Sequence, residues 1–362
     1  MRMAKVTTKT MKSTEPLRFI MLGAGFWARY QLAAWGEQGG AVQCVGVCDS
    51  DRDKAEALAQ VFGVDDVYTD AGEALEKTRP DFVDIVTPPA THAALARLCV
   101  ERNIAAICQK PLAESVREAQ VMVETAERAT VPLLVHENWR WQAPLREAKQ
   151  QLEAGTIGRP FRARLTFSCS FPVFEKQPFL ATLPQFILTD IGTHILDTAR
   201  ALFGEAQSVY ATTRGINPVI KGEDVATVML RMGDNGETTV IVEMSYASRT
   251  EHERFPQTYL FVEGDNGALE IGPDYLLRVT TRNEGDWNAP VTTVRRVPPP
   301  RYDWANPVYD LVQASMVPCQ ADLLKHLRGE GVAQTTARDN LETLRLVFAA
   351  YESAAVGEVV RL

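Results

Sequence analysis

Two side chains in the middle of this sequence have the types and the spacing that proton transfer to or from a hydroxyl group requires. Asp190 and His194 lie four residues apart, so they share one face where a helix begins. A histidine accepts or releases a proton near pH 7, and a carboxylate beside it orients the ring or holds a substrate hydroxyl. An alternative of equal weight is that Asp190 caps the helix and His194 lies in the core.

A lysine at the end of an earlier strand is the third group with this chemistry. Lys110 lies in Gln109-Lys110-Pro111, directly after the apolar run Ala105–Cys108. Ligands bind at the carboxyl ends of parallel strands, where a lysine can hydrogen-bond a hydroxyl group and stabilise charge as its proton leaves. An exposed surface lysine explains the same residue equally well.

Two arginines are candidates for binding a substrate. Arg140 lies between two tryptophans, whose rings offer stacking faces for a sugar. Arg164 shares one face of a predicted strand with Arg162, and for this pair a solvated surface role is the favoured interpretation. The predicted substrate-binding residues are Lys110, Arg140, Arg164, Asp190 and His194.

A glycine motif near the start of the chain predicts a dinucleotide site. Gly23-Ala24-Gly25-Phe26-Trp27-Ala28 fits the pattern G-x-G-x-x-G/A, and it directly follows the predicted strand Leu17–Leu22 and opens a predicted helix, Trp27–Trp35. Gly23 permits the tight turn, and Gly25 lets the backbone approach a pyrophosphate at the helix N-terminus. A plain glycine turn is the alternative, and the strand and helix on either side argue against it.

Residues after the next strands extend this site. Asp49 ends the second strand, where a carboxylate binds the adenosine ribose and repels a 2′-phosphate, so NAD is favoured over NADP. A helix cap is the alternative role for Asp49, and the nearby Arg52 could accommodate a phosphate. His92 is as well explained by a helix-start position as by a cofactor contact. The predicted cofactor-binding residues are Gly23, Gly25, Phe26, Trp27, Asp49, Thr87, Pro88, His92, Gln109, Lys110, Asn138 and Trp139.

The predicted secondary structure that must position these residues follows two patterns along the chain. Strands and helices alternate over residues 17–140, which is typical of a Rossmann domain with a doubly wound parallel sheet. Residues 141–336 carry mostly strands, which predicts an α+β domain with a large, mostly antiparallel open sheet. We expect residues 1–16 to be a disordered leader. A C-terminal helix and tail over residues 337–362 are predicted to pack back near the Rossmann domain.

Composition narrows the class of protein. The chain has 362 residues and a formal net charge of −8, which argues against nucleic acid or an anionic membrane as the main partner. No apolar run approaches the roughly 18 residues of a membrane helix. Six cysteines occur without metal-binding spacing, which predicts buried, reduced thiols in a cytoplasmic protein and no metal site.

Taken in order, the motifs resemble those of the Gfo/Idh/MocA oxidoreductases. They are Gly23-Ala24-Gly25, Thr87-Pro88-Pro89 with His92, Gln109-Lys110-Pro111, Asn138-Trp139-Arg140, Asp190 with His194, and Tyr351-Glu352-Ser353-Ala354. The resemblance implies that Lys110, Asp190 and His194 form the catalytic group. His194 would be the acid and base, Lys110 would polarise the reacting oxygen, and Asp190 would orient the substrate or His194. The family's usual Glu is Gln109 here.

The resemblance also implies an activity and a mode of assembly. Members oxidise or reduce sugars, cyclitols and their derivatives, and their open sheet makes oligomer contacts, so a homodimer or homotetramer is expected. Residues 25–35 are similar to the D-apiose dehydrogenases of this family, which implies an NAD-dependent enzyme that oxidises an aldose such as D-apiose at its anomeric carbon to a lactone. An inositol or sugar-acid dehydrogenase and a non-catalytic, cofactor-sensing regulator are the alternatives. The presence of all three catalytic types favours an enzyme.

Overall fold

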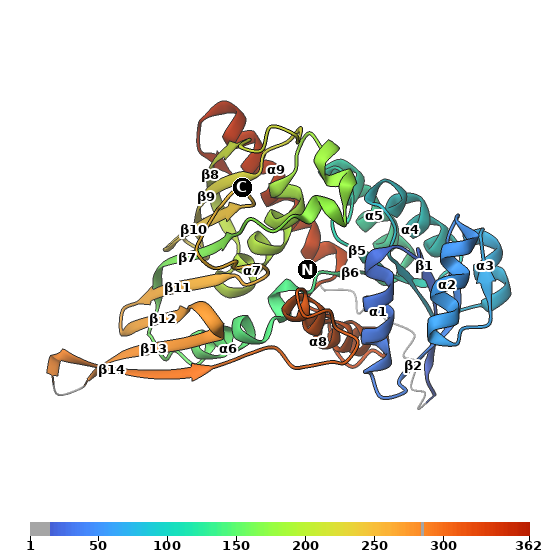
Figure 1. The fold of residues 1–362 in the computed structure, drawn as a ribbon, viewed down its shortest axis with the longest axis horizontal. Helices are drawn as coiled ribbons and strands as arrows, with labels where there is room; N and C mark the ends of the chain where they lie inside the picture. The colour runs from blue at the N-terminus through green and yellow to red at the C-terminus, as the bar shows by residue number, and fades with distance from the viewer. Residues whose placement is uncertain (1–14, 284–285) are drawn as a thin grey trace, which may run out of the picture. The chain divides into compact units, whose positions relative to one another are not determined.

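The computed structural model describes residues 15–283 and 286–362, and these form two compact units (Figure 1). The first unit comprises the chain up to Glu137 together with Met316–Leu344, and the second comprises Asn138–Ser315 and Arg345–Leu362. The predicted leader, apart from Glu15 and Pro16, lies outside the described residues.

The first unit is built on one parallel sheet. Its described residues form six strands in the order β3-β2-β1-β4-β5-β6. The strands are β1 (Leu17–Leu22), β2 (Val42–Cys48), β3 (Val67–Tyr68), β4 (Phe82–Ile85), β5 (Ala105–Gln109) and β6 (Leu133–His136). The helices that join them are α1 (Phe26–Gly36), α2 (Arg52–Phe62), α3 (Ala71–Thr78), α4 (His92–Glu101) and α5 (Val116–Ala129). The strand order reverses beside β1, which is where such sheets bind ligands, and the predicted Rossmann class is confirmed.

Local sequence explains how these helices begin and pack. The side chains of Asp51, Asp70 and Ser115 accept hydrogen bonds from the first backbone N–H groups of α2, α3 and α5. Trp35 on α1 packs against Phe19 and Phe82 of the sheet, with ring centroids 5.6 and 5.4 Å away. The apolar side chains of β1 and β4 are almost fully buried, so α1 is held tightly on this face.

One segment from late in the chain, Met316–Leu344, completes the first unit. Helices α8 (Asp310–Leu327) and α9 (Ala337–Val356) each run from one unit into the other. The backbone N–H of Val135 donates to the carbonyl of Thr335 at 2.8 Å, which gives β6 a partner at its outer edge. The structure therefore differs from the predicted division at residues 141–336, because Met316–Leu344 satisfies backbone and core positions of the Rossmann unit.

The second unit contains a mixed sheet. Its described strands lie in the order β14-β13-β12-β11-β7-β10-β9-β8-β15. They are β7 (Pro160–Ser168), β8 (Ala206–Arg214), β9 (Val225–Met232), β10 (Thr238–Ser245), β11 (Tyr259–Gly264), β12 (Gly267–Ile271), β13 (Leu276–Asn283), β14 (Asp286–Arg296) and β15 (Val360–Arg361). Only β7 and β10 among these described pairs are parallel, which confirms a mostly antiparallel sheet. Strand β15, in the C-terminal tail, pairs with β8 in this sheet, and the start of the preceding helix α9 belongs to the first unit.

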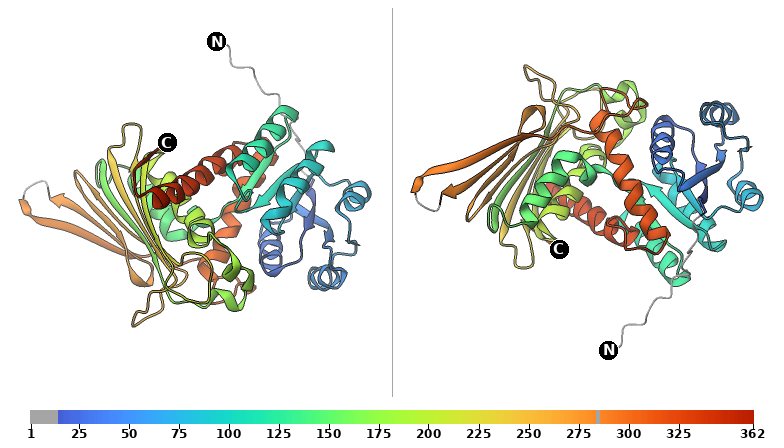
Figure 2. Two further views of the ribbon diagram at one scale, coloured as in Figure 1. Left: turned by 90° about the horizontal axis from the view of Figure 1, so that it is seen from above. Right: turned by 90° about the horizontal axis from the view of Figure 1, so that it is seen from below.

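One face of this sheet is buried and the other is open. Along β9, Ala226, Val228 and Leu230 are buried, whereas Thr227 and Met229 on the opposite face are exposed. Helices α6 (Ala143–Glu153) and α7 (Thr193–Phe203) lie on the buried face, and no helix of the described residues covers the other (Figure 2). None of the described helices has the length and apolar character to span a membrane.

Candidate active site

The glycine loop of the first unit has two glycines with different reasons to be glycine. Gly23 has φ of +101°, and a Cβ there would lie 2.2 Å from the carbonyl oxygen of Val86. No residue with a side chain fits that position. Gly25, in contrast, has no heavy atom within 4 Å of where its Cβ would be, so its surface is open to a ligand.

The start of α1 fits the pyrophosphate of a dinucleotide. Gly25 is the N-cap of the helix, no side chain caps the first N–H groups, and the first turn holds no acidic residue. Uncapped N–H groups and the positive end of the helix dipole attract phosphate oxygens. Ala28 is fully buried, so helix and sheet approach closely behind the loop. Phe26 and Trp27 lie half-buried in the first turn, edge to face at 5.2 Å.

Asp49 lies where β2 ends and is bonded to the glycine loop. Its Oδ2 accepts the backbone N–H of Ala24 at 2.7 Å, and its Oδ1 accepts that of Asp51 at 2.9 Å. These bonds fix the carboxylate next to the dinucleotide loop. Each carboxylate oxygen can accept a further bond, so the ribose role predicted for Asp49 is compatible with this geometry.

His92 holds two loops of the predicted cofactor site together. Its ring is fully buried, with Nε2 2.9 Å from the carbonyl oxygen of Thr87 and Nδ1 3.0 Å from that of Pro111. Burial lowers the pKa of His92, against the opposing effect of the backbone bonds. This arrangement argues against the predicted direct cofactor contact and makes His92 a tether between the ends of β4 and β5.

Lys110 is half-buried at the end of β5, and a line of polar side chains leads to it from the core. The backbone N–H of Lys110 donates to Oε1 of Gln109 at 2.9 Å, and Nε2 of Gln109 donates to Oε1 of Gln31 at 2.7 Å. Gln31 donates in turn to Asp84 at 2.7 Å. Sequence reasoning missed Gln31 and Asp84, although a charged residue inside the apolar run Phe82–Val86 is an available signal.

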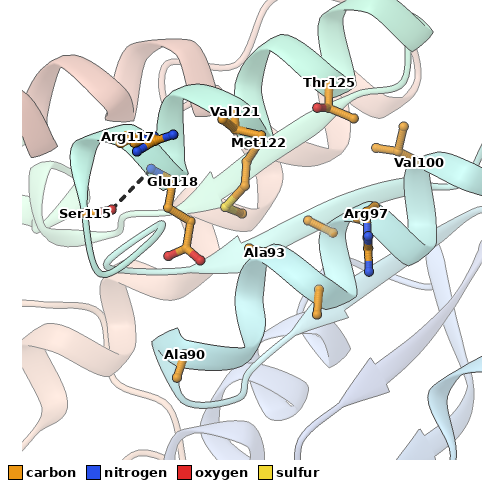
Figure 3. A pocket seen from close by; sticks show the side chains of 12 residues that line it. Ala90, Ala93, Arg97, Val100, Ser115, Arg117, Glu118, Val121, Met122 and Thr125 are labelled. Carbon is orange, nitrogen blue, oxygen red and sulfur yellow. Dashed lines mark hydrogen bonds between the residues drawn. The ribbon is translucent and has the colours of Figure 1, made fainter.

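A groove with a volume of about 540 Å³ lies between α4 and α5 on the first unit (Figure 3). Small and apolar residues such as Ala93, Val121 and Met122 line it, with Arg97 and Glu118 among them. None of the predicted site residues is part of its wall, so this groove is separate from the dinucleotide loop.

In the second unit, Asp190 lies in a π-helical turn, Leu188–Gly192, that leads directly into α7. Such turns are frequent at functional sites. The hydroxyl of Tyr246 donates to Oδ2 of Asp190 at 3.4 Å. Burial, and next the charge of Asp190, hold the pKa of Tyr246 far above its usual range, so it remains a donor. No side chain caps α7, which removes helix capping as the role of Asp190.

A buried carboxylate organises this turn. Glu223 accepts the backbone N–H groups of Phe186 at 3.1 Å and Leu188 at 3.3 Å, and the hydroxyl of Tyr351 at 2.6 Å. Tyr351 belongs to the closing sequence motif, so that motif holds the chain that leads into the Asp190 turn. Sequence reasoning also missed Glu223, since nothing in its local sequence indicates a partner more than 100 residues away.

His194 lies one helical turn after Asp190 and is almost fully buried. Its ring stacks on that of Trp139, with centroids 4.5 Å apart. Nε1 of Trp139 donates to the hydroxyl of Thr258 at 2.9 Å, which fixes the indole. Asn138, also a predicted cofactor residue, donates its amide to the carbonyl of Val312 at 2.8 Å in the same unit.

The two arginines predicted to bind substrate have partners in the fold. Arg140 is buried and donates from Nε to Asp197 at 2.6 Å and from Nη2 at 2.5 Å. This two-bond pair anchors α7 three residues after His194. Arg164 is exposed on the open face of the sheet, 3.6 Å from Glu243, whereas α7 packs on the buried face. Its position argues against a shared substrate with His194 within one chain.

Each unit thus offers one half of the predicted chemistry. The first presents Lys110 at the end of β5 beside a loop that fits a dinucleotide, and the second presents Asp190 and His194 held by buried partners. Within the described ranges, no group of three or more His, Cys, Asp or Glu side chains is arranged to hold a metal ion.

Comparison with known proteins agrees with this geometry. Residues 17–137 match a family model described as an oxidoreductase family with an NAD-binding Rossmann fold, and residues 145–270 match the GFO/IDH/MocA C-terminal domain. The chain belongs to the GFO/IDH/MocA family of oxidoreductases, and its first unit is an NAD-binding domain.

Two relatives match almost from end to end. A D-apiose dehydrogenase from Paraburkholderia graminis is 41% identical, over 99% of this chain and 93% of its own length. Another, from Rhizobium rhizogenes, is 39% identical, over 97% of this chain and 98% of its own length. The crystal structure of an oxidoreductase from Agrobacterium radiobacter, in complex with NAD+, L-tartaric acid and magnesium, is 38% identical, with a TM-score of 0.91 over 95% of this chain and 98% of that one.

Proposed function

We propose that this protein is an NAD-dependent sugar dehydrogenase that oxidises D-apiose at its anomeric carbon to the lactone. The observation that carries the proposal is the identity of 41% and 39% to two D-apiose dehydrogenases over nearly the whole chain. Short matches confined to the Rossmann unit would support only cofactor binding. These alignments include the unit that carries Asp190 and His194.

In this proposal the side chains of the two units serve one reaction. The N-terminus of α1 holds the pyrophosphate of NAD, and Asp49 holds its adenosine ribose. NAD, when bound, supplies a hydride acceptor. An imidazole nitrogen of His194 takes the proton of the substrate hydroxyl as base. Lys110 donates a hydrogen bond to the same oxygen, and Asp190 orients the sugar or the imidazole.

A panel of aldoses, cyclitols and sugar acids with NAD and NADP, followed by NADH absorbance at 340 nm, tests the activity. We expect the highest kcat/KM with D-apiose and NAD. Sugar acids belong in the panel because L-tartaric acid is bound in the Agrobacterium radiobacter structure. Preference for a cyclitol or a sugar acid would replace the proposed substrate. Tight NAD binding without turnover of any compound would indicate a cofactor-sensing regulator.

Variants test the proposed roles. Lys110→Ala and His194→Ala should each lower kcat by about 10²- to 10⁴-fold, while the dissociation constant for NAD, measured by calorimetry, changes little. Lys221→Ala and His252→Ala are matched controls, because both residues are exposed and neither belongs to the proposed site. Unchanged turnover in the Lys110 and His194 variants would overturn the assignment.

We also propose a homo-oligomer that forms through the open face of the second-unit sheet, and a cytoplasmic location. Met229 and Phe261 project from that face, 45% and 41% exposed, and paired sheet faces commonly bury such side chains. Light scattering on the wild type and on Phe261→Lys tests the assembly, which the lysine should weaken.

The proposed cytoplasmic location rests on the cysteines. All six are free thiols, as a reducing compartment requires, and cell fractionation tests the location.

A further inference from the structure

A single line of hydrogen bonds connects a carboxylate in the core of the Rossmann unit to the backbone of Lys110. Asp84, on β4, is fully buried and accepts Nε1–H of Trp35 at Oδ2 and Nε2–H of Gln31 at Oδ1, both at 2.7 Å. Gln31 is also fully buried. Its Oε1 accepts the amide of Gln109, whose own Oε1 accepts the N–H of Lys110.

The direction of every bond in this line follows from the carboxylate at its inner end. An ionised Asp84 can only accept, so Gln31 must turn its NH₂ group toward it and present its oxygen to position 109. The residue at position 109 must then donate to Gln31 and accept from Lys110. An amide does both, whereas an ionised carboxylate cannot donate.

This arrangement explains why position 109 carries a glutamine. With a glutamate at that position the amide of Gln31 would have to reverse, and its oxygen would then face the carboxylate of Asp84 without a proton between them. The cost of such an unmatched buried pair is high. The line accommodates one carboxylate, which can stand at position 84, 31 or 109 provided that the other two positions carry amides.

We propose that Asp84 and Gln31 are positioning residues for Lys110, which act through Gln109, and that the carboxylate at position 84 requires the amide at position 109. The inference rests on the proposed function only where it concerns turnover by Lys110. The hydrogen-bond line itself is a property of the first unit and can be measured without a substrate.

A bond to an ionised carboxylate is stronger than one between neutral groups, and each bond in a line polarises the next. The line therefore holds the backbone of Lys110 from the inside of the sheet. Nδ1 of His92 lies 3.0 Å from the neighbouring carbonyl oxygen of Pro111. The ammonium group of Lys110 consequently extends from a backbone segment held by side chains of the core, as a group acting on a substrate oxygen requires.

A charge exchange between positions 84 and 31 tests the proposal. In Asp84→Asn alone, the new amide has a single oxygen, but Nε1–H of Trp35 and the amide of Gln31 both donate to this side chain. Gln31→Glu alone places two carboxylates side by side. In the double variant, the new amide at position 84 accepts from Trp35 and donates to the new carboxylate at position 31, whose other oxygen accepts from Gln109. Every donor then has an acceptor, and the line again holds one carboxylate.

Four forms of the full-length protein are compared: the wild type, the two single variants and the double variant. We expect kcat to fall about tenfold or more in each single variant, the loss that follows from one unmatched bond in the line. KM for the sugar and the dissociation constant for NAD should change less than kcat. The double variant should recover kcat to within about threefold of the wild type.

Two readouts need no turnover. The melting temperature should fall in the single variants and recover in the double variant. The backbone amide resonance of Lys110 should move upfield when its bond weakens and return in the double variant. Recovery of the melting temperature without recovery of kcat or of the Lys110 resonance would make the line purely structural and overturn the positioning role. Absence of recovery in all readouts would overturn the one-carboxylate rule.

These readouts also separate this inference from the proposed function. If the wild type oxidises none of the sugars tested, the proposed function fails, and the Lys110 resonance and the melting temperature still decide whether the line exists. Gln109→Glu adds a test of the second claim, because its loss of melting temperature should be reversed by Asp84→Asn. Additive losses in that double variant would show that position 84 does not determine the residue at position 109.

Discussion

The imidazole ring of His194 lies on the indole of Trp139 at a centroid distance of 4.5 Å, with the two planes 23° apart. Both rings are nearly fully buried. Stacking of this kind fixes a ring plane and contributes on the order of 1 kcal/mol. Trp139 belongs to the second unit and has its Nε1–H committed to Thr258, so its first effect is on His194.

Trp139→Leu should therefore lower kcat more than it affects cofactor binding. The leucine removes the flat partner of His194, so the imidazole loses its fixed plane and kcat should fall about tenfold or more. Trp139→Phe keeps an aromatic face but loses the bond to Thr258, and it should retain most of the activity. Steady-state kinetics and calorimetry with NAD measure both effects. A large loss of NAD affinity with unchanged kcat would instead support the cofactor contact predicted from the sequence.

The two glycines of the dinucleotide loop should respond differently to alanine. Gly23→Ala forces a Cβ to within 2.2 Å of the Val86 carbonyl at a positive φ, so we expect a loss of about 1 to 3 kcal/mol in unfolding free energy. Gly25→Ala meets no atom within 4 Å and should leave the melting temperature nearly unchanged. It should nevertheless weaken NAD binding about tenfold or more, because the methyl group occupies the space of the pyrophosphate. Equal melting temperatures for the two variants would contradict this distinction.

Asp49→Asn should shift cofactor preference toward NADP. The substitution removes the negative charge that repels a 2′-phosphate, while the amide oxygen can still accept the N–H of Ala24. We expect the ratio of kcat/KM for NADP to that for NAD to rise about tenfold. Asp65→Asn, at an exposed position, makes the same change in net charge and serves as the control. An identical rise in the control would assign the effect to overall charge.

Asp84 should make stability depend on pH in an unusual direction for a carboxylate. Burial raises the pKa of Asp84 from 3.8 to about 6, against the opposing effect of the bonds from Trp35 and Gln31. The nearby thiols of Cys44 and Cys108 stay neutral, because burial raises the pKa of each well above its usual range. The folded protein therefore binds the Asp84 proton more tightly than the unfolded chain does.

This stabilising contribution is complete below about pH 3.8 and is lost as the pH rises through about 6. Its size is about 3 kcal/mol. The wild type should thus lose stability between about pH 4 and pH 6 relative to Asp84→Asn, whose side chain does not titrate. Urea unfolding of both proteins across this range measures the difference. Parallel curves for the two proteins would mean that Asp84 titrates alike in the folded and unfolded states.

The parts of the site that the sequence predicted are those set by local pattern. Gly23 and Gly25 follow a strand and open a helix, and spacing alone brings Asp190 and His194 onto neighbouring turns. The role of His92 could not be predicted in this way, because its partners are backbone carbonyls of loops that only the fold brings together. Gln31 and Asp84 were missed for the same reason, although Asp84 stands out in an otherwise apolar strand.

The helices and strands likewise divide into those that local sequence pattern predicts and those that it does not. In the Rossmann unit, the strand Leu17–Leu22 was predicted with its observed bounds, and the helix predicted over Trp27–Trp35 is observed over Phe26–Gly36. Strands β12, β14 and β15 were not predicted, since short strands, such as β12 and β15, and polar strands, such as β14, carry little periodic signal. The assignment of Met316–Leu344 to the first unit depends on tertiary bonds such as that between Val135 and Thr335, which no sequence pattern reveals.

That late return to the Rossmann unit has a consequence during synthesis on the ribosome. Strand β6 emerges early, but the carbonyl of Thr335 that its edge bonds to is translated about 200 residues later, after most of the second unit; at roughly 5 to 20 residues per second this takes about 10 to 40 s. During that interval the β6 edge of the nascent Rossmann sheet lacks this hydrogen-bond partner. We therefore expect expression to depend on chaperones, and a gene fragment that stops at Glu137 to fold poorly.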